Sequence, residues 1–560
     1  MAAWTPTATA LVVAALGLCL HAFRKAWTAR AHFWRVRKLG KPMPPWSPLL
    51  GHLLSAGKMF DCLPADGHSC YMLRMLSLDF PDGAFYLDVW PMQEPILVVS
   101  DPEMSYTVET HPIVGCTKPR TLQGWFHPIS GGPAQSDLNG APWRYLHDLF
   151  SPAFSTANVN AMAPVIVDRI DIFRHILRQR VAAGERFELE PSVLSLINDM
   201  ICETLLGMES DVQRQGHPLT EAMMRQLRLK FTEYNPANAL AFLNPLTRYH
   251  LWNNSRILDA GMKAQLQRRF DAYLADREGQ EARVFKPLID IAVEDYLARP
   301  ENAGTTTLDR DFLDLMARNM RQAFFVGYDS TASSLIFCYH LLSLHPDALA
   351  RIRAEHDAVF GPEMDSVSRQ IVDRPHALNV LPYTTAVIKE AMRLFPVANG
   401  IRQGSPDLEL VSASGTRYPT AGFQVVISHY SNHMNPRAWP RPEEFLPDRW
   451  LVDRDHELYP PPKAWRPFAH GPRSCPGQQQ VMTEIKAVLA CTVREFDICD
   501  AYGELDVAAG KKPQDLAGVA GYRPYMVDAG AAHPTGRYPC RVTLSGYKPT
   551  NSHEACTGGG

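Results

Sequence analysis

The sequence predicts a mainly α-helical fold with a small β region, and three observations lead to this prediction. Apolar residues follow helical spacing through most of the chain after about residue 101. Runs with strand character are few and short. The chain has 560 residues, of which 46% are hydrophobic and 21% charged, so a large core can form. Because no internal repeat is visible, we expect one large helical domain.

Apolar spacing, together with capping and breaking residues, places individual segments along the chain. The spacing predicts helices over 142–149, 162–180, 194–206, 259–282, 309–344, 346–360, 384–394 and 478–496. Short apolar runs predict strands over 84–89, 96–99, 408–411 and 423–428. Loops rich in proline and glycine lie between them, but none has the character of a domain linker.

The N-terminal region differs from the rest of the chain. Residues 1–23 carry no charged side chain and are long enough to span a bilayer as a helix. Basic residues follow at once, beginning with Arg24 and Lys25, and the positive-inside rule then keeps the bulk of the chain cytosolic. A cleaved signal peptide, which normally has its positive charge before the apolar run, and a buried core helix are the alternatives. We expect a transmembrane anchor over 1–23, a basic and proline-rich hinge over 24–52, the main domain over 53–550 and a disordered tail over 551–560.

Composition limits the partners and the compartment. The formal net charge is −3, so nothing in the overall charge indicates a nucleic-acid partner. The eleven cysteines are scattered without a C-x-x-C pair, which argues against a disulfide framework and favours a reducing compartment. Cys475 lies in a loop of glycine, proline and arginine just before a helix, and it needs a separate explanation.

The stretch FAHGPRSCPG, residues 468–477, has features of a metal-ligand loop. A thiolate from Cys475 would be an electron-rich ligand for iron, and backbone N–H groups at the start of the following helix could bond to its sulfur. Gly471 permits a sharp turn with positive φ, and Gly477 permits close packing on a flat cofactor. Phe468 can cover the sulfur from water, and Arg473 can reach an anionic group beside the ring plane. A structural cysteine is the alternative.

The pattern F-x-x-G-x-R-x-C-x-G resembles the haem-binding loop of the cytochrome P450 family, the haem-thiolate monooxygenases. Further motifs follow the same resemblance in order. In KEAMRLFP, Glu390 and Arg393 share one helix face, and EEFLPDRW supplies Arg449. The resemblance implies a buried structural triad of these three residues, whereas a solvated surface pair is the ordinary explanation of an isolated E-x-x-R.

The segment FFVGYDSTASSL resembles the oxygen-side helix of the family, which implies that Asp329, Ser330 and Thr331 serve proton transfer to oxygen. Val326 stands where alanine is common, and Ser330 where threonine is common. Serine keeps the hydroxyl, but its freer rotamer is expected to loosen the coupling of oxygen reduction to product. A kinked core helix with a solvated aspartate is the alternative.

The resemblance also suggests contacts with the haem propionates. Trp143 and His147 are four residues apart and share a helix face, and His147 stands where the family often has arginine. Arg402 is a further candidate. Ordinary packing is the alternative for all three.

The resemblance implies a function for the chain. Haem b would be bound through an axial thiolate from Cys475, and one oxygen atom from O2 would be inserted into a hydrophobic small molecule. Electrons would come from NADPH through a flavoprotein reductase, docked on a basic face that includes Lys463, Arg466 and Arg473. The pocket lining is expected from residues 123–129, 229–242, 324–328, 397–401 and 519–522.

We expect an endoplasmic reticulum protein with one membrane span and a cytosolic catalytic domain. Within the family, the chain resembles fungal enzymes of secondary metabolism. Three alternatives remain open at this point. The first is a haem-thiolate isomerase, dehydratase or peroxide-using enzyme without O2 activation. The second is a haem sensor or electron carrier, and the third is a protein without haem in which Cys475 is structural.

Overall fold

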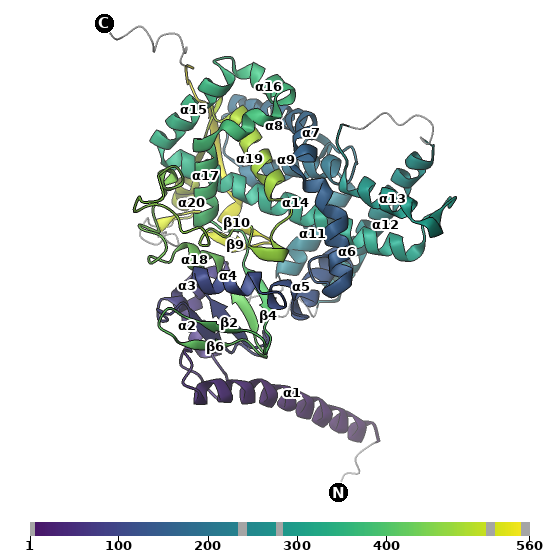
Figure 1. Ribbon diagram of the computed structural model, residues 1–560, viewed down its shortest axis with the longest axis vertical. Helices are drawn as coiled ribbons and strands as arrows, with labels where there is room; N and C mark the ends of the chain where they lie inside the picture. Colours follow the sequence, from purple (N-terminus) through teal and green to yellow (C-terminus); the bar gives the residue numbers. More distant parts are fainter. Residues whose placement is uncertain (1–5, 233–243, 276–283, 511–520, 550–560) are drawn as a thin grey trace.

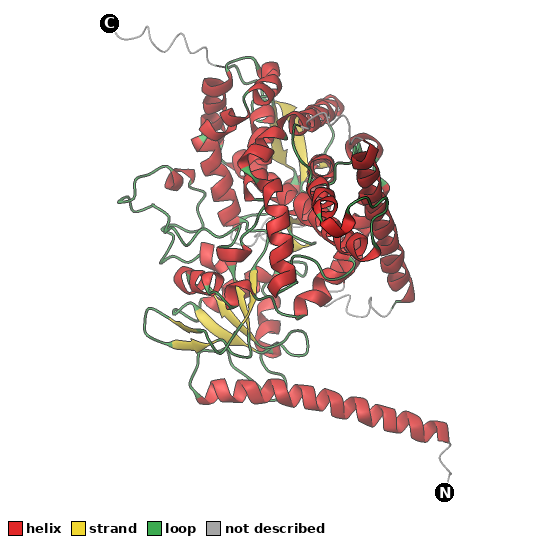
Figure 2. Cartoon of the chain, turned by 45° about the vertical axis from the view of Figure 1, so that its right-hand side comes forward, coloured by secondary structure: helices red, strands yellow, loops and turns green. Residues whose placement is uncertain are grey.

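The computed structural model describes residues 6–232, 244–275, 284–510 and 521–549. Figures 1 and 2 show most helices gathered in one large body, with a small sheet at one end from which the first helix extends. The helices are α1 Pro6–Lys38, α2 Leu53–Phe60, α3 Ser69–Ser77, α4 Pro102–Thr110, α5 Thr121–Ser130, α6 Gly140–Phe150, α7 Thr156–Ala161, α8 Ala163–Ala183, α9 Leu189–Thr204, α10 Val212–Gln215, α11 Pro218–Thr232, α12 Pro245–Ala275, α13 Leu288–Ala298, α14 Arg310–Leu344, α15 Pro346–Phe360, α16 Val367–Asp373, α17 Pro382–Leu394, α18 His429–His433, α19 Gln478–Thr492 and α20 Tyr502–Ala508.

The strands form small sheets that join distant parts of the chain. They are β1 Ala84–Leu87, β2 Ile96–Val99, β3 Phe187–Glu188, β4 Gly400–Gln403, β5 Glu409–Val411, β6 Arg417–Pro419, β7 Gln424–Ile427, β8 Phe496–Asp500, β9 Met526–Asp528, β10 Ala532–Pro534 and β11 Pro539–Leu544. The largest sheet has the order β1-β2-β7-β4, with β2 and β7 parallel and the other pairs antiparallel. A second sheet has the order β3-β11-β8, and two hairpins pair β5 with β6 and β9 with β10. The mainly helical fold with a small β region is therefore confirmed.

The 35-residue helix α14 runs through the centre of the helical body and contacts α5, α9, α12, α17 and α19. Asp309 caps its start, since the side chain accepts a hydrogen bond from the Phe312 N–H at 2.8 Å. Pro346 opens the next helix two residues after α14 ends, because proline cannot continue a helix but fits its first turn. The helix predicted over 309–344 is thus confirmed, with Asp309 as its cap.

Three helix predictions have bounds that are wrong by four residues or more. The helix predicted over 194–206 begins five residues earlier, since α9 begins at Leu189. α12 begins at Pro245, fourteen residues before the expected start, because its first turns are polar and carry little apolar periodicity. α19 ends at Thr492, residues 493–495 form a turn, and Phe496 begins strand β8. Phe496 pairs there with Leu544 on β11, a partner that lies far along the chain.

The first helix is longer than the expected anchor. α1 continues without a break to Lys38, because residues 24–38 contain no proline or glycine. Only residues 39–52 of the expected hinge are therefore non-helical, and they form mainly turns and irregular chain. The end of α1 docks on the small sheet, where Phe33 and Val36 are buried and Arg30 pairs with Asp88. Within the part of the chain that the structure describes, no helix combines the length and apolar character needed to cross a membrane. The expected tail, residues 551–560, lies outside that part.

Candidate functional site

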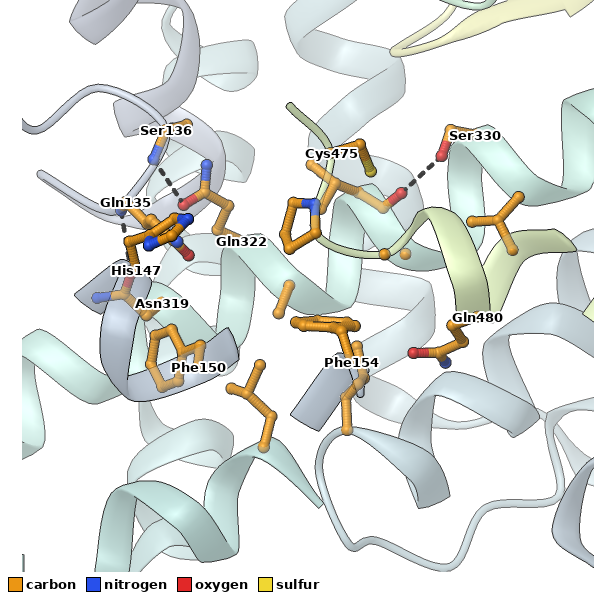
Figure 3. A pocket seen from close by; sticks show the side chains of 18 of the residues that line it. Gln135, Ser136, His147, Phe150, Phe154, Asn319, Gln322, Ser330, Cys475 and Gln480 are labelled. Carbon is orange, nitrogen blue, oxygen red and sulfur yellow. Dashed lines mark hydrogen bonds between the residues drawn. The ribbon is translucent and has the colours of Figure 1, made fainter. Parts of the chain in front are cut away.

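A cavity of about 350 Å³ lies between α14 and the loop that contains Cys475. Figure 3 shows the Cys475 sulfur and the Ser330 hydroxyl on its walls, with Phe150 and Phe154 on another side. Most other lining side chains are apolar, and the polar Asn319 and Gln322 of α14 accept backbone hydrogen bonds from the 135–136 segment at 3.0 and 3.2 Å. Of the expected lining segments, 123–129 contributes Phe126 and 324–328 contributes Val326 and Gly327, whereas 229–232, 397–401 and 521–522 do not line this cavity. Residues 233–242 and 519–520 lie outside the described residues.

The loop before α19 presents the Cys475 sulfur to this cavity. The Cys475 N–H donates to the Phe468 carbonyl at 2.9 Å, which closes the loop on itself. Burial raises the pKa of the Cys475 thiol, while hydrogen bonds from the backbone N–H groups of Gly477 and Gln478 lower it. Such N–H donors at a helix start are the expected partners of a metal-bound thiolate. A Cβ built on Gly477 would lie 3.8 Å from the Cys475 sulfur and 3.9 Å from the Phe154 ring. The donors and the aromatic wall fit a flat iron cofactor held by sulfur.

Gly471 is needed for this loop to approach α4. Its φ is +72°, and a Cβ built on it would lie 2.2 Å from the Glu109 carbonyl oxygen. The Glu109 side chain accepts a hydrogen bond from the His470 N–H at 2.9 Å and pairs with Arg466. Glu109 and Arg466 are both fully buried. The expected basic docking face therefore needs correction, because Arg466 is inside the protein, and Lys463 pairs with Glu103 at 2.7 Å.

We predict that Gly471→Ala destabilises the protein and lowers its content of the haem that the resemblance implies. The substitution meets both an unfavourable left-handed φ, which costs roughly 1–2 kcal/mol, and a backbone clash that only a loop movement relieves. Gly415→Ala is the matched control, because Gly415 has φ +85° but open space around its Cβ. Urea unfolding and haem quantification check this: an equal loss in both variants would contradict a specific role for the close approach.

Three cations gather at one edge of the cavity: Lys118, Arg402 and Arg473. Burial and then the charges of the two arginines hold the pKa of Lys118 well below its usual range. Burial and the Arg402 charge lower the pKa of Arg473 to about 10. Arg402 is buried and donates to the Gly115 carbonyl at 3.0 Å, while one of its terminal nitrogens has no hydrogen-bond partner in the described structure. These features fit an anionic group such as a carboxylate of the cofactor.

Sequence reasoning gave no role to Lys118, although it lines the cavity together with Arg473. Arg473 donates to the carbonyls of Cys116 and Leu138, and its guanidinium carbon lies 4.0 Å from the centre of the Trp143 ring. His147 lines the cavity and bonds to Asp148 at 3.1 Å. Of the residues expected to contact the cofactor here, Trp143, His147 and Arg473 line this edge of the cavity. Arg402 is not a lining residue, although its charge acts on Lys118 and Arg473.

The three residues of α14 that were expected to act together at the cavity point to different places. Ser330 and Thr331 line the cavity, and their hydroxyls donate to the Val326 and Gly327 carbonyls at 2.9 Å each. Asp329 is not among the lining residues. Its carboxylate accepts the Ala531 N–H at 2.6 Å and contacts His533, on the side of α14 that faces β10. In this structure Asp329 therefore does not stand beside Ser330 at the cavity as expected.

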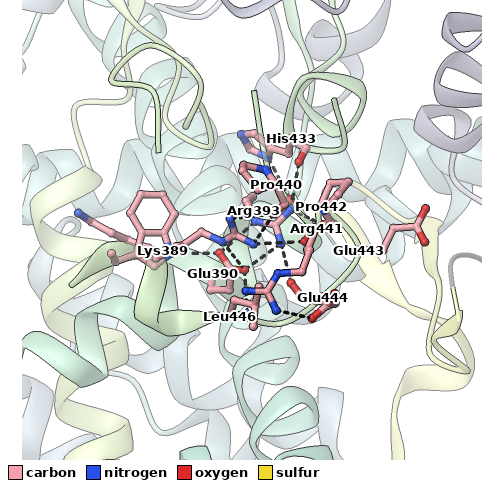
Figure 4. A network of polar contacts seen from close by, with 12 residues as sticks. Lys389, Glu390, Arg393, His433, Pro440, Arg441, Pro442, Glu443, Glu444 and Leu446 are labelled. Atoms are coloured by element: carbon pink, nitrogen blue, oxygen red, sulfur yellow. Dashed lines mark hydrogen bonds and ion pairs between the residues drawn. The ribbon is translucent and has the colours of Figure 1, made fainter. Parts of the chain in front are cut away.

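The Glu–Arg pair forms the centre of a buried network (Figure 4). Glu390, Arg393 and Arg449 are all fully buried, and the Glu390 carboxylate accepts from Arg393 at 2.8 and 3.0 Å and from Arg449 at 3.0 Å. Arg393 also donates to the carbonyls of His433 and Glu444. The network ties α17 to the segment that leads into the Cys475 loop and does not reach the cavity.

Comparison with known proteins gives a consistent result. A family model described as cytochrome P450 matches residues 42–504. The chain is similar to the cytochrome P450 monooxygenase polC of Polytolypa hystricis, with 34% identity over 96% of this chain and 95% of that protein. It is also similar to the cytochrome P450 monooxygenase acrF of Aspergillus aculeatus, with 30% identity over 79% of this chain and 90% of that protein.

Solved structures agree with the fold. The crystal structure of the cytochrome P450DA heme domain has a TM-score of 0.66 and 19% identity, and the match covers 92% of this chain and 98% of that one. A second cytochrome P450 crystal structure, CYP102L1, has a TM-score of 0.68 and 18% identity, covering 90% of this chain and 98% of that one. At this identity the likeness supports the arrangement of helices and sheets alone.

Proposed function

Because the chain belongs to the cytochrome P450 family, we propose that this haem-thiolate monooxygenase oxidises a hydrophobic small molecule of fungal secondary metabolism. In the overall reaction, substrate, O2, NADPH and a proton give oxygenated product, water and NADP⁺, and a flavoprotein reductase passes the electrons. The observation that carries the proposal is the Cys475 sulfur, which faces a largely apolar cavity across from the Ser330 hydroxyl.

Haem b, held by the Cys475 thiolate, would supply the activation of O2 and the insertion of one of its oxygen atoms into the substrate, while the other leaves as water. The chain's own residues prepare the site. The N–H groups of Gly477 and Gln478 hydrogen-bond to the sulfur and so moderate its electron donation. Lys118 and Arg473 would hold the cofactor carboxylates. The Ser330 hydroxyl would hold a proton at the oxygen side, where it already bonds to the Val326 carbonyl.

The cofactor would fill the part of the cavity beside the Cys475 loop, and the apolar lining along α14 supports a hydrophobic substrate next to it. Phe126, Phe150 and Val326 face the cavity, and the amide oxygens of Asn319 and Gln322 are taken up by the neighbouring loop. The lining also contains polar groups on the side of α19, where Gln480 and Glu484 have buried oxygens without a hydrogen-bond partner in the described structure. The apolar side chains along α14 would select a substrate by shape and exclude water.

Metabolite profiling of a deletion strain tests the substrate class. We expect a hydrophobic intermediate to accumulate, and the purified holoenzyme with reductase should convert it while consuming NADPH and O2. Conversion without NADPH would favour the isomerase, dehydratase or peroxide-using alternative, and accumulation of a highly charged compound would contradict the proposed substrate class.

We further propose that the N-terminal segment anchors the enzyme to the endoplasmic reticulum membrane. Residues 1–23 carry no charge, and the apolar side chains of α1, among them Leu16, Leu18, Leu20 and Phe23, are exposed in this structure. Basic residues follow on the same helix. Deletion of residues 1–23 should move the enzyme from the microsomal pellet to the supernatant, and unchanged sedimentation would contradict an anchor in this segment.

A further inference from the structure

A buried histidine links three separate elements behind the oxygen side of the cavity. His533 lies on β10 and is 3% exposed. Its Nε2 lies 3.1 Å from the Asp329 carboxylate on α14, and its Nδ1 lies 2.5 Å from the Glu190 carboxylate on α9. Both carboxylates are themselves buried. A single imidazole therefore bridges two acids, one of which immediately precedes Ser330 in the chain.

The hairpin formed by β9 and β10, residues 526–534, is held against α14 at several further points; we call it the C-terminal hairpin. The Ala531 N–H donates to Asp329 at 2.6 Å, and the Ser333 hydroxyl donates to the Ala532 carbonyl. Gly530 has φ +126°, and a Cβ on it would lie 2.7 Å from the Asp329 carboxylate oxygen. Only glycine allows the hairpin backbone to come this close to the acid.

The charges around His533 favour its protonated form. Burial alone would lower the pKa of His533, but the carboxylates of Asp329 and Glu190 outweigh burial and raise the pKa to about 10. Beyond this pair, Arg537 lies 3.9 Å from Glu190. Among the described residues, the phenols of Tyr502 on α20 and Tyr328 on α14 also face the cluster, and burial and the neighbouring carboxylates raise their pKa values.

We propose that His533 is a positioning residue for the oxygen side of the cavity: by bridging two acids it keeps Asp329 docked on the C-terminal hairpin, away from the cavity that Ser330 lines. Asp329 then accepts two hydrogen bonds from the hairpin and offers none of its oxygens to the cavity. The hydroxyls and backbone of α14 then separate the Asp329 carboxylate from the cavity. His533 acts on the reaction only through Asp329 and touches no cavity atom.

The test compares His533→Gln with a matched variant of a histidine that lies outside the C-terminal hairpin but contacts it. His68→Gln removes another buried histidine that pairs with a hairpin carboxylate, Asp528, at 2.9 Å. Purified holoenzymes are given NADPH and a microsomal reductase without added substrate, and the ratio of hydrogen peroxide to water formed from O2 is measured. We expect this ratio to rise by about fivefold or more in His533→Gln, since loss of a charged hydrogen bond shifts the docking equilibrium by such a factor. His68→Gln should keep the wild-type ratio.

The double variant Asp329→Asn/His533→Gln shows whether His533 acts through Asp329. The two changes should be strongly non-additive, so that His533→Gln has little further effect once Asp329 is replaced. In the wild type the ratio should also rise as the pH approaches about 10 and the imidazolium is lost, whereas His533→Gln should show no such rise. A wild-type ratio in His533→Gln, an equal change in His68→Gln or simple additivity would each overturn the proposal.

A second measurement needs no turnover. A folded pKa of about 10 against an ordinary value of 6.5 means that the charged imidazole stabilises the protein fully below about pH 6.5 and progressively less as the pH rises toward 10. The difference in melting temperature between wild type and His533→Gln should therefore be largest near pH 6 and shrink toward pH 10. A difference that does not change with pH would mean that His533 is uncharged in the bridge, and this would overturn the proposal even if a variant fails to turn over.

Discussion

Cys475→Ala should abolish monooxygenase turnover and remove the characteristic absorption of the ferrous carbonyl complex. The Cys475 thiolate would hold the haem iron, and alanine would leave the metal without this protein donor. The expected loss of activity is complete, and the haem content should fall because Cys475 would supply the coordinate bond between the chain and the iron. Carbonyl difference spectra and NADPH-supported product formation measure the two effects.

Cys499→Ala is the appropriate control for that experiment. Cys499 lies on β8, is exposed and does not line the cavity, so its replacement should leave spectrum and turnover as in the wild type. If the carbonyl absorption and the turnover both survive in Cys475→Ala, another residue ligates the iron and the assignment of the site fails.

Local patterns explain why the cysteine loop could be predicted from the sequence. The ligand, the tight turn and the helix start lie within ten residues of one another, so their geometry is set by short-range backbone rules. The same holds for α14 and α15, whose bounds follow from an aspartate cap and a proline start. Segments whose structure is decided by their own residues are accessible to sequence reasoning.

Long-range contacts explain what the sequence did not reveal. Lys118 joins Arg473 at the cavity edge, and His533 reaches Asp329, in each case across hundreds of residues. From the sequence, Arg466 is expected to be a cation on the surface. It is buried instead, together with its partner Glu109, which lies on the distant helix α4. Strand β4 was likewise missed, because a four-residue strand is stabilised by its pairing with β7 more than by its own composition.

Glu390→Ala should be the most destabilising change outside the cavity. The carboxylate accepts from Arg393, Arg449, the Trp450 indole at 3.1 Å and the Leu446 N–H at 3.0 Å, and its removal leaves two guanidinium groups buried without their counter-charge. Breaking a buried pair in this way typically costs about 3–5 kcal/mol. Urea unfolding followed by circular dichroism measures the loss of free energy.

The control for Glu390→Ala is Glu409→Ala, which removes a carboxylate from the exposed Arg417–Glu409 pair and should cost less than about 1 kcal/mol. Because Arg393 also holds the carbonyls of the chain that leads to the Cys475 loop, haem should dissociate from Glu390→Ala at a lower urea concentration than from the control. Equal stability of the two variants would mean that the remaining carbonyl contacts satisfy both arginines. The burial of these charges implies the opposite, since carbonyl dipoles do not replace a full negative charge inside a protein.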